Sequence, residues 1–194
     1  MRKETRIIVE IALLVGVALV FDVIAGLFSP FKYGGSISPA MLPIFIIAYR
    51  RGLKPGLYAG FIFGVLQALL AEVLGYGVFA FIVDEGWWKF IVMFFLDYIL
   101  PFTLLGLAGV FKNPLKSKTS FILGISLGSL LRYLSHSVSG VLIWSYYAEL
   151  ANMNVYLYSF VAYNLPYMAA SYAFCLVIGI ILYDRNVWSY GLTE

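Results

Sequence analysis

The sequence predicts an all-α integral membrane protein: a single domain over residues 1–194 in which six transmembrane helices form a bundle. Two observations carry this prediction. Of the 194 residues, 62% are hydrophobic and 12% are charged, whereas a typical soluble domain has about 25% charged residues. The apolar residues also fall into long runs, and roughly 20 such residues let a helix cross the hydrocarbon of a bilayer. Short polar loops between the runs leave no space for a soluble domain.

Six apolar segments are expected to be the helices. They cover about residues 7–28, 39–49, 55–74, 89–111, 120–147 and 156–183. The first follows basic residues, as a signal peptide would. However, Asp22 interrupts its apolar run and no small-residue cleavage site follows, so we interpret it as a permanent helix. The second segment is short for a full span and is expected to be tilted, partly re-entrant or longer than the pattern indicates.

Glycines recur every four residues in two of these segments. The third segment has Gly52, Gly56, Gly60 and Gly64, and the fifth begins with Gly124 and Gly128. Small residues at this spacing let two helix backbones approach closely. We expect them to serve packing inside the bundle rather than an oligomer interface.

Lysines and arginines are distributed unequally between the two sides of the predicted bundle. One side, formed by the N-terminus, the tail and the loops after the second and fourth segments, has Arg2, Lys3, Arg6, Arg50, Arg51, Lys54, Lys112, Lys116, Lys118 and Arg185. The other side has Lys32 and Lys89, and Arg132 lies within the fifth segment. Because cytoplasmic loops carry an excess of Lys and Arg, both termini are expected to be cytoplasmic, and an even number of helices agrees with this.

The ionisable side chains of interest inside the predicted helices are Asp22, Glu72, Asp97, Arg132 and His136. Each costs about 2.5–3.5 kcal/mol at the centre of a transmembrane helix on insertion scales, so each needs a reason to be there. Arg132 is interpreted either as half of an internal ion pair, with Asp22 or Glu72 as its partner, or as part of a functional site.

Asp97, His136 and Asn164 lie on three different segments at similar depth. Counted from the outer ends of their helices at 1.5 Å per residue, they are roughly 13, 16 and 10 Å deep. All three therefore share the outer half of the membrane. We expect them to converge on one pocket.

Aromatic side chains surround this level. Tyr98 follows Asp97, and Trp144 continues the four-residue steps that run through His136 and Gly140 on one helix face. An aromatic belt at the membrane interface accounts for most of the other tyrosines and tryptophans. Aromatic faces attract organic cations, and a carboxylate pairs with a cation or an aminopyrimidine edge. The predicted pocket suits a flat, nitrogen-rich, positively charged small molecule.

Several classes of function are disfavoured. Cys175 is the only cysteine, so an internal disulfide and a cysteine metal cluster are impossible. No metal, cofactor or nucleic-acid partner is expected. The sequence has no His-Glu-x-x-His, Gly-x-Ser-x-Gly or paired aspartate motif, so the protein is not expected to be an enzyme. No internal repeat is evident, which disfavours an inverted-repeat secondary transporter. A proton-coupled transporter with Asp97 and His136 as relays remains an alternative.

Clusters along nearly the whole chain resemble one known family. They are Glu10-Ile11-Ala12, Gly34-Gly35-Ser36-Ile37-Ser38, Ala48-Tyr49-Arg50, Gly52-Leu53-Lys54, Leu96-Asp97-Tyr98, Gly106-Leu107-Ala108-Gly109, Leu131-Arg132-Tyr133-x-x-His136-x-x-Ser139-Gly140 and Tyr163-Asn164-x-x-Tyr167-Met168. With these clusters the chain resembles the thiamine-specific substrate-binding (S) component of the energy-coupling factor (ECF) transporters of bacteria. An S component for another vitamin is the alternative within this class.

The resemblance implies a high-affinity thiamine site near the outer surface, between the fourth, fifth and sixth helices and beneath the loop after the first. It assigns binding roles to Asp97, Tyr98, His136, Trp144, Asn164, Trp87 and Tyr158. These include the residues that depth and spacing place in one pocket.

The resemblance also implies a multi-pass protein of the bacterial cell membrane that delivers thiamine with an energising module. That module consists of a transmembrane coupling protein and two cytoplasmic ATPases. Docking on it would use a small-residue face of the first helix at Ala12 and Gly16, for which ordinary packing within the bundle is the alternative. The chain has no Gly-x-x-x-x-Gly-Lys-Ser/Thr phosphate loop, in agreement with a component that does not hydrolyse ATP.

Overall fold

The computed structural model describes residues 2–28, 36–75, 79–80, 86–111 and 114–189, and the regular elements in these ranges are helical. The long helices are α1 (Lys3–Leu27), α3 (Leu53–Val73), α7 (Lys118–Leu142) and α9 (Leu165–Asp184). The shorter elements are α2 (Met41–Arg51), α5 (Trp87–Met93), the π-helical η1 (Phe94–Ile99), α6 (Leu100–Leu105), the 3-10 turn η2 (Gly106–Val110), α8 (Ser145–Leu150), the π-helical η3 (Leu157–Asn164) and the 3-10 turn η4 (Val187–Ser189).

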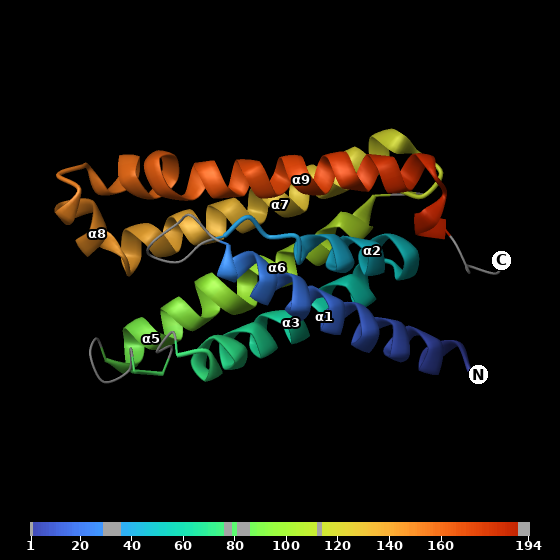
Figure 1. Cartoon of the computed structure of the whole chain (residues 1–194), viewed down its shortest axis with the longest axis horizontal. Coiled ribbons are helices and arrows are strands. Elements are labelled where there is room, and N and C mark those ends of the chain that lie inside the picture. Colours follow the sequence, from blue (N-terminus) through green and yellow to red (C-terminus); the bar gives the residue numbers. More distant parts are fainter. Residues whose placement is uncertain (1, 29–35, 76–78, 81–85, 112–113, 190–194) are drawn as a thin grey trace.

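The helices run roughly along the long axis of the molecule and form one bundle (Figure 1). α7 and α9 lie side by side, and α3 packs against α6. The start of α1 and the end of α9 lie at the same end of the bundle (Figure 1), as expected if both termini face the same side of a membrane. The side that they face stays a prediction.

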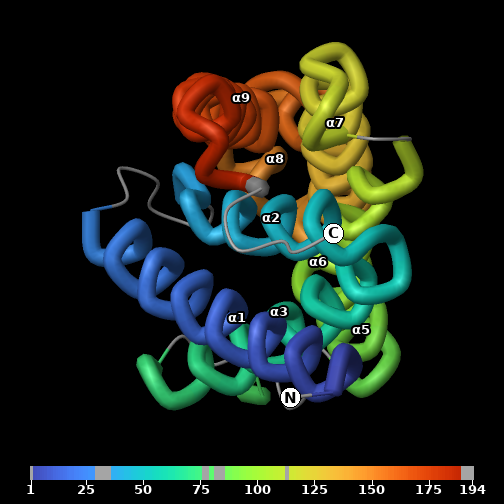
Figure 2. Tube along the Cα trace, turned by 90° about the vertical axis from the view of Figure 1, so that its right-hand side faces the viewer, coloured from blue at the N-terminus to red at the C-terminus, as the bar shows by residue number. Residues whose placement is uncertain are grey.

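The short helix α2 occupies the centre of the bundle (Figure 2). It contacts α1, α3, α6 and α9, and Ile44, Phe45 and Ile47 are fully shielded from solvent. Near its C-terminal end, the Tyr49 hydroxyl donates a hydrogen bond to the backbone oxygen of Phe121 on α7, 2.5 Å away. Because a helix that is apolar all round is normally buried, α2 forms part of the core.

Five helical stretches in the described part of the chain are long and apolar enough to cross a membrane. They are Lys3–Leu27, Leu53–Val73, Trp87–Val110, Lys118–Leu142 and Leu157–Asp184. The remaining predicted helix, the second (residues 39–49), corresponds to α2, whose 11 residues are about 16 Å long at 1.5 Å per residue. The hydrocarbon of a bilayer is roughly 30 Å thick. The predicted count of six transmembrane helices is therefore not confirmed, because α2 alone is too short to span.

The fifth predicted helix, over residues 120–147, extends too far at its C-terminal end. α7 ends at Leu142 and α8 begins at Ser145, with Trp144 in the turn between them. At this bend the Trp144 indole N–H donates a hydrogen bond to Asp97, which lies on another element. No proline or glycine marks the bend, so the apolar pattern continues through it and does not predict the break.

Two π-helical turns interrupt segments that the sequence predicts to be regular helices. η1 and η3 each end directly before an α-helix that has a proline in its first turn, Pro101 in α6 and Pro166 in α9. Proline lacks the N–H that would bond to the carbonyl four residues earlier. The preceding turn is thereby free to widen.

The widened turn in η1 is held by a side chain of α7. The backbone N–H of Leu100 bonds to the oxygen of Phe95, five residues earlier. The Leu96 carbonyl is left without its usual helical donor, and the Ser135 hydroxyl donates to it instead at 2.7 Å. Single π turns of this kind are frequent at functional sites.

The predicted close packing through glycines is confirmed for Gly60 and Gly64 on α3. A Cβ atom on Gly60 would overlap the backbone of Phe102, and one on Gly64 would overlap the backbone of Tyr98. α3 therefore lies directly against α6 and η1. Gly52 serves a different purpose, because it forms the turn between α2 and α3 with a φ of 90°, a conformation that favours glycine.

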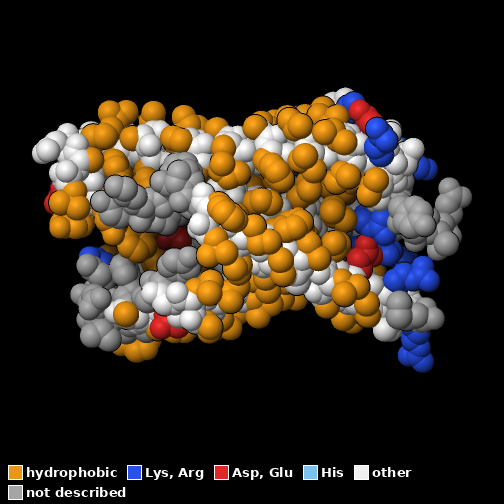
Figure 3. All heavy atoms as spheres, viewed as in Figure 1, with side chains coloured by type: hydrophobic (Ala, Val, Ile, Leu, Met, Phe, Trp, Pro, Cys, Tyr) orange, Lys and Arg blue, Asp and Glu red, His pale blue; other side chains and the backbone are white. Residues whose placement is uncertain are grey.

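Hydrophobic side chains cover the flank of the bundle, whereas Lys and Arg gather mainly at the end that holds the start of α1 (Figure 3). On α1 the apolar surface is extensive, with Leu13 66% and Val20 57% exposed. Large exposed apolar surfaces indicate contact with a membrane or a partner. The surface is thus that of a protein surrounded by lipid.

Candidate ligand-binding site

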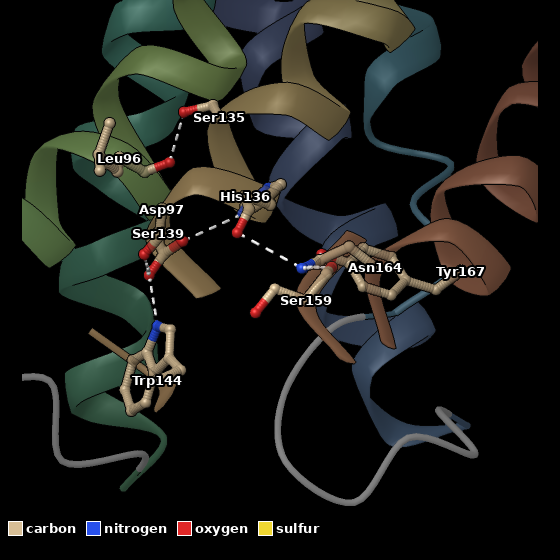
Figure 4. Close-up of polar contacts among 9 residues, drawn as sticks. All are labelled: Leu96, Asp97, Ser135, His136, Ser139, Trp144, Ser159, Asn164 and Tyr167. Carbon is tan, nitrogen blue, oxygen red and sulfur yellow. Dashed lines mark hydrogen bonds and ion pairs between the residues drawn. The ribbon is translucent and has the colours of Figure 1, made fainter. Parts of the chain in front are cut away.

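The candidate site is centred on the Asp97 carboxylate, which η1 presents to α7 (Figure 4). Oδ1 of Asp97 lies 3.2 Å from Nδ1 of His136. Oδ2 accepts hydrogen bonds from the Ser139 hydroxyl at 2.7 Å and from the Trp144 indole N–H at 2.9 Å. Hydrogen bonds to a charged group are stronger than neutral ones. The carboxylate therefore holds two side chains of α7 and the tryptophan after it in place.

His136 has one ring nitrogen that the cluster uses and one that it does not. Because an ionised carboxylate only accepts hydrogen bonds, Nδ1 of His136 carries the proton that points to Asp97. Nε2 is buried and has no hydrogen-bond partner among the described residues. In a neutral imidazole this second nitrogen is an acceptor. It is therefore a candidate contact for a donor group of a ligand.

A second polar group joins η3 to α7 beside His136. The amide nitrogen of Asn164 donates to the backbone oxygen of Ser159 at 2.7 Å and makes a longer contact, 3.4 Å, with that of His136. The Tyr167 hydroxyl donates to the Asn164 side-chain oxygen. A Cβ atom on Gly140 would lie 2.8 Å from the Ser159 hydroxyl. The missing side chain at Gly140 thus lets η3 approach α7.

Aromatic rings extend the site along η3 and the turn after α7. Trp144 lies 6.2 Å from Tyr147, with the ring planes 36° apart. The rings of Tyr158 and Tyr163 stack at 5.8 Å, and Tyr163 meets Tyr167 edge-on at 5.9 Å. Attractive aromatic pairs have centroids 4.5–7 Å apart. The rings therefore form two sets beside the polar cluster, one at Trp144 and one along η3.

The predicted convergence of polar groups from three segments is confirmed. Asp97 contacts His136 and Trp144 directly, and Asn164 reaches the backbone of His136. Tyr158 is connected to this cluster through the other tyrosines of its segment. The ligand-binding roles of these residues stay predictions.

Two predicted site residues lie apart from the hydrogen-bonded cluster. The Tyr98 ring packs against Phe94 at 6.2 Å and against a small apolar cluster that includes Met93. Trp87, the first residue of α5, is 68% exposed and meets Phe90 edge-on at 6.4 Å. The loop that the resemblance places over the site falls mostly on residues 29–35, which lie outside the described residues.

Ser139, Ser159 and Tyr167 belong to the cluster, although the sequence prediction does not include them. Helical spacing could have found two of them. Ser139 and Tyr167 each follow a predicted site residue by three positions, a spacing at which side chains are neighbours on a helix. No comparable signal marks Ser159, whose hydroxyl has no partner among the described residues and lies against Gly140.

The direct ion pair interpreted for Arg132 is not found among the salt bridges of the described residues. Its guanidinium group is buried and lies over the Phe102 ring, 4.6 Å from the centroid, where cation–π attraction is expected. Asp22 instead accepts a hydrogen bond from Gln67 at 3.1 Å, and Glu72 accepts one from a backbone N–H at 2.9 Å. Arg132 lies over a ring of α6 and Asp22 on α1 is hydrogen-bonded to α3, so the two charges attract each other at longer range without a direct contact.

The arrangement of the cluster is suited to binding a ligand. Ser139 donates to Asp97 and not to His136, so the three side chains do not form the relay of a serine hydrolase. In the part of the chain that the structure describes, no group of three or more His, Cys, Asp or Glu side chains could hold a metal ion. A partly exposed carboxylate with aromatic neighbours is suited to a cationic aromatic ligand.

The fold and the cluster together define a multi-pass, all-helical membrane protein with an acidic and aromatic candidate binding site. The chain belongs to the thiamine transporter protein family (Thia_YuaJ), whose model matches residues 8–188. The predicted family is thereby confirmed, and so is the prediction of a bacterial multi-pass membrane protein.

Three relatives illustrate the similarity. The thiamine transporter ThiT of Bacillus subtilis (strain 168) is 31% identical over 191 residues, which cover 93% of this chain and 92% of the relative. ThiT of Lacticaseibacillus paracasei is 27% identical over 193 residues, covering 93% and 88% of the two chains. A solved structure of ThiT from Listeria monocytogenes has a TM-score of 0.73 at 27% identity and covers 95% of this chain and 96% of that one. The relatives are named as transporters and not as enzymes, as predicted.

Proposed function

We propose that the protein binds extracellular thiamine as the S component of an ATP-dependent ECF transporter. The observation that carries the proposal is the Asp97 carboxylate held by His136, Ser139 and Trp144 within an apolar bundle. The names of the related transporters support the choice of thiamine over another vitamin. The ECF assignment follows from the family resemblance and from the absence of a phosphate-binding loop in this sequence.

Each part of thiamine has a chemical counterpart in the cluster. Thiamine joins a positively charged thiazolium ring to an aminopyrimidine. The cation is attracted to Asp97 and to the face of Trp144. The aminopyrimidine offers an N–H donor and ring nitrogens that can pair with Nε2 of His136 and the Ser159 hydroxyl, both without partners among the described residues. Buried polar atoms are normally paired, so a ligand that supplies these partners gains affinity.

The decisive experiment compares two partly buried carboxylates by titration calorimetry on purified protein. Asp97→Asn removes the charge opposite the ligand. A hydrogen bond to a charged group contributes about 1.5–3 kcal/mol, so thiamine affinity should fall roughly tenfold to a hundredfold. Asp22→Asn makes the same chemical change within α1, and its amide oxygen can still accept from Gln67. This control should bind thiamine like the wild type.

Other outcomes separate the alternatives. If the wild-type protein ignores thiamine but binds a different vitamin, the S-component assignment stands and the thiamine assignment fails. If it binds no vitamin and takes up substrate in response to a proton gradient without ATPases, it is a secondary transporter and the whole proposal fails.

We also propose that the chain crosses the membrane six times, with both termini in the cytoplasm. α1 and α3 run in the same direction along the bundle (Figure 1), so the chain must return between Leu27 and Leu53. Residues 36–40 reach at most about 18 Å when extended, and α2 adds about 16 Å. Together they approach the roughly 30 Å of hydrocarbon. The excess of Lys and Arg at the end of the bundle that holds the start of α1 and the end of α9 supports the cytoplasmic assignment.

Cysteine labelling tests this orientation. Lys116→Cys and Glu149→Cys, each in a Cys175→Ala background, place single exposed thiols at opposite ends of the bundle. A membrane-impermeant maleimide added to intact cells should label position 149 and leave position 116 protected. The reverse pattern would contradict the orientation and the outward-facing site.

A further inference from the structure

A cavity lies at the end of the bundle that holds the start of α1, away from the Asp97 cluster. Its volume is about 560 Å³, and residues of α1, of α2 and of the segment from Leu182 to Trp188 line it. α1 and α9 both pack on α2. The cavity is thus bounded by two helices that flank α2 and by the turn that follows α9.

Positive charge predominates around this cavity. Arg6, Arg50 and Arg185 line it, and among the described lining residues Glu10 is the carboxylate that opposes them. Glu10 is already paired with Arg50 and with Arg51, the second of these at 2.5 Å. The described lining residues therefore carry more positive than negative charge, which favours an anion.

The inner part of the cavity is built from fixed side chains. Nη1 of Arg50 donates to the backbone oxygen of Trp188 at 2.6 Å. Trp188 is buried, and its indole N–H donates to the oxygen of Gly179 at 2.9 Å. The side chains of Arg50 and Glu10 are 13% and 15% exposed. In contrast, Arg6 and Arg185 are exposed and stand at the rim.

The remaining wall is apolar and reaches the outside of the bundle. Val9 and Leu13 on α1 are 43% and 66% exposed, and Val187 across the cavity is 50% exposed. Leu13 belongs to the apolar flank of α1 that also includes Val20. A molecule in the cavity can therefore contact the arginines with one part and the hydrocarbon-facing surface with another.

From this juxtaposition we infer that the cavity binds an anionic phospholipid. Its phosphate lies against Arg6 and Arg185, and an acyl chain follows Val9 and Leu13. Guanidinium groups bind phosphate with paired hydrogen bonds, and basic pockets between transmembrane helices bind anionic headgroups. A lipid fits better than free phosphate, because free phosphate gains nothing from the apolar wall. The inference does not depend on which ligand the Asp97 cluster binds.

The test uses the purified full-length protein in a neutral detergent. Dioleoylphosphatidylglycerol, dioleoylphosphatidylcholine and inorganic phosphate are titrated separately, and bound lipid is counted by native mass spectrometry. We expect the wild type to retain phosphatidylglycerol in preference to phosphatidylcholine. The double variant Arg6→Gln with Arg185→Gln should bind phosphatidylglycerol roughly thirtyfold more weakly. This estimate assumes that each arginine near the headgroup contributes a factor of about ten or less to the affinity. Lys54→Gln with Lys116→Gln removes the same charge from exposed positions outside the cavity and should have no effect.

Three outcomes would overturn the inference. Equal retention of both lipids would show that charge does not select the occupant. An equal loss in the lysine control would indicate a diffuse basic surface instead of a cavity. Phosphate that displaces phosphatidylglycerol at similar concentration would assign the site to free phosphate. Thiamine affinity measured on the same variants should not change. A negative result for the lipid therefore leaves the thiamine proposal intact, and a negative result for thiamine leaves the lipid inference intact.

Discussion

The Asp97 carboxylate accepts hydrogen bonds from Ser139 and Trp144 and lies 3.2 Å from His136, so a change at any donor also alters how the carboxylate is held. Trp144 combines two contributions that substitutions can separate. Its N–H bonds to Asp97, and its ring is expected to stack on the bound cation. A binding measurement can distinguish the two because phenylalanine keeps an aromatic ring and loses the N–H.

Trp144→Phe should weaken thiamine binding roughly tenfold, as expected for about 1.5 kcal/mol from one hydrogen bond to a charged group. Trp144→Ala should cost up to about thirtyfold more, since cation–π attraction reaches ~2 kcal/mol when desolvated. Titration calorimetry measures both, and the quenching of tryptophan fluorescence by thiamine should be reduced in each variant. Trp88→Phe is the matched control, because Trp88 is exposed. Equal affinities of the phenylalanine and alanine variants would contradict a stacking role.

The sequence predicts the members of the cluster better than their partners. Depth and spacing identify Asp97, His136 and Asn164, because membrane insertion makes a polar side chain conspicuous. The partner of Arg132 is not predictable in this way. Helical periodicity gives the face on which a side chain lies, but a buried guanidinium can be stabilised by a carboxylate or by a ring such as Phe102. Only the packed structure decides between them.

At the scale of elements, the two prolines that follow η1 and η3 explain why the site is not built on regular helices. Leu100 bonds to Phe95 instead of Leu96, and Pro101, five residues after Leu96, has no N–H to donate in the π-helical pattern. Leu96 therefore keeps a free carbonyl, to which Ser135 on α7 donates at 2.7 Å. Asp97 is the residue after Leu96. The widened turn therefore ties the backbone beside Asp97 to the helix that presents His136.

Pro101→Ala tests whether the π turn positions Asp97. Alanine restores the backbone N–H and favours a regular helix, and closing the π turn rotates the residues before it by about 100° relative to those after it. Thiamine affinity should fall at least about tenfold, the loss expected for one contact to a charged group, without a loss of thermal stability. Pro55→Ala, in the first turn of α3 where the missing N–H is not needed, should leave affinity unchanged. Wild-type affinity of Pro101→Ala would show that tertiary contacts alone hold the turn.

The positions of the long helices follow from the sequence, and their interruptions do not. The predicted segments 55–74 and 7–28 agree with α3 and α1 within a few residues because long apolar runs have little alternative in lipid. The break at Trp144 carries no proline or glycine, and it coincides with a hydrogen bond to a residue 47 positions away. A local pattern cannot contain that information.

On the scale of the whole molecule, α1 is the helix with the least burial. Only Ile11, Val15 and Ala18 are buried among its described residues. Ala12 and Gly16 are exposed, and a Cβ atom on Gly16 would meet nothing within 4 Å. Ordinary packing within the bundle therefore does not account for the small side chains at these positions. The proposed docking of an energising module on this face does.

Gly16→Trp should abolish most thiamine uptake in cells that contain the energising module, while purified protein binds thiamine normally. The indole has space on the isolated chain, so the fold is preserved, but it blocks the close helix approach that small residues permit. We expect at least a tenfold loss of uptake, which corresponds to a loss of more than about 1.4 kcal/mol in the free energy of docking on the module. Val17→Trp is the control, because Val17 is also exposed and lies about 100° around the helix. Normal uptake by Gly16→Trp would remove this face from the docking surface, and a parallel loss of binding would assign the effect to folding. If Val17→Trp impairs uptake equally, the contact covers a broader arc of α1 than the small residues define.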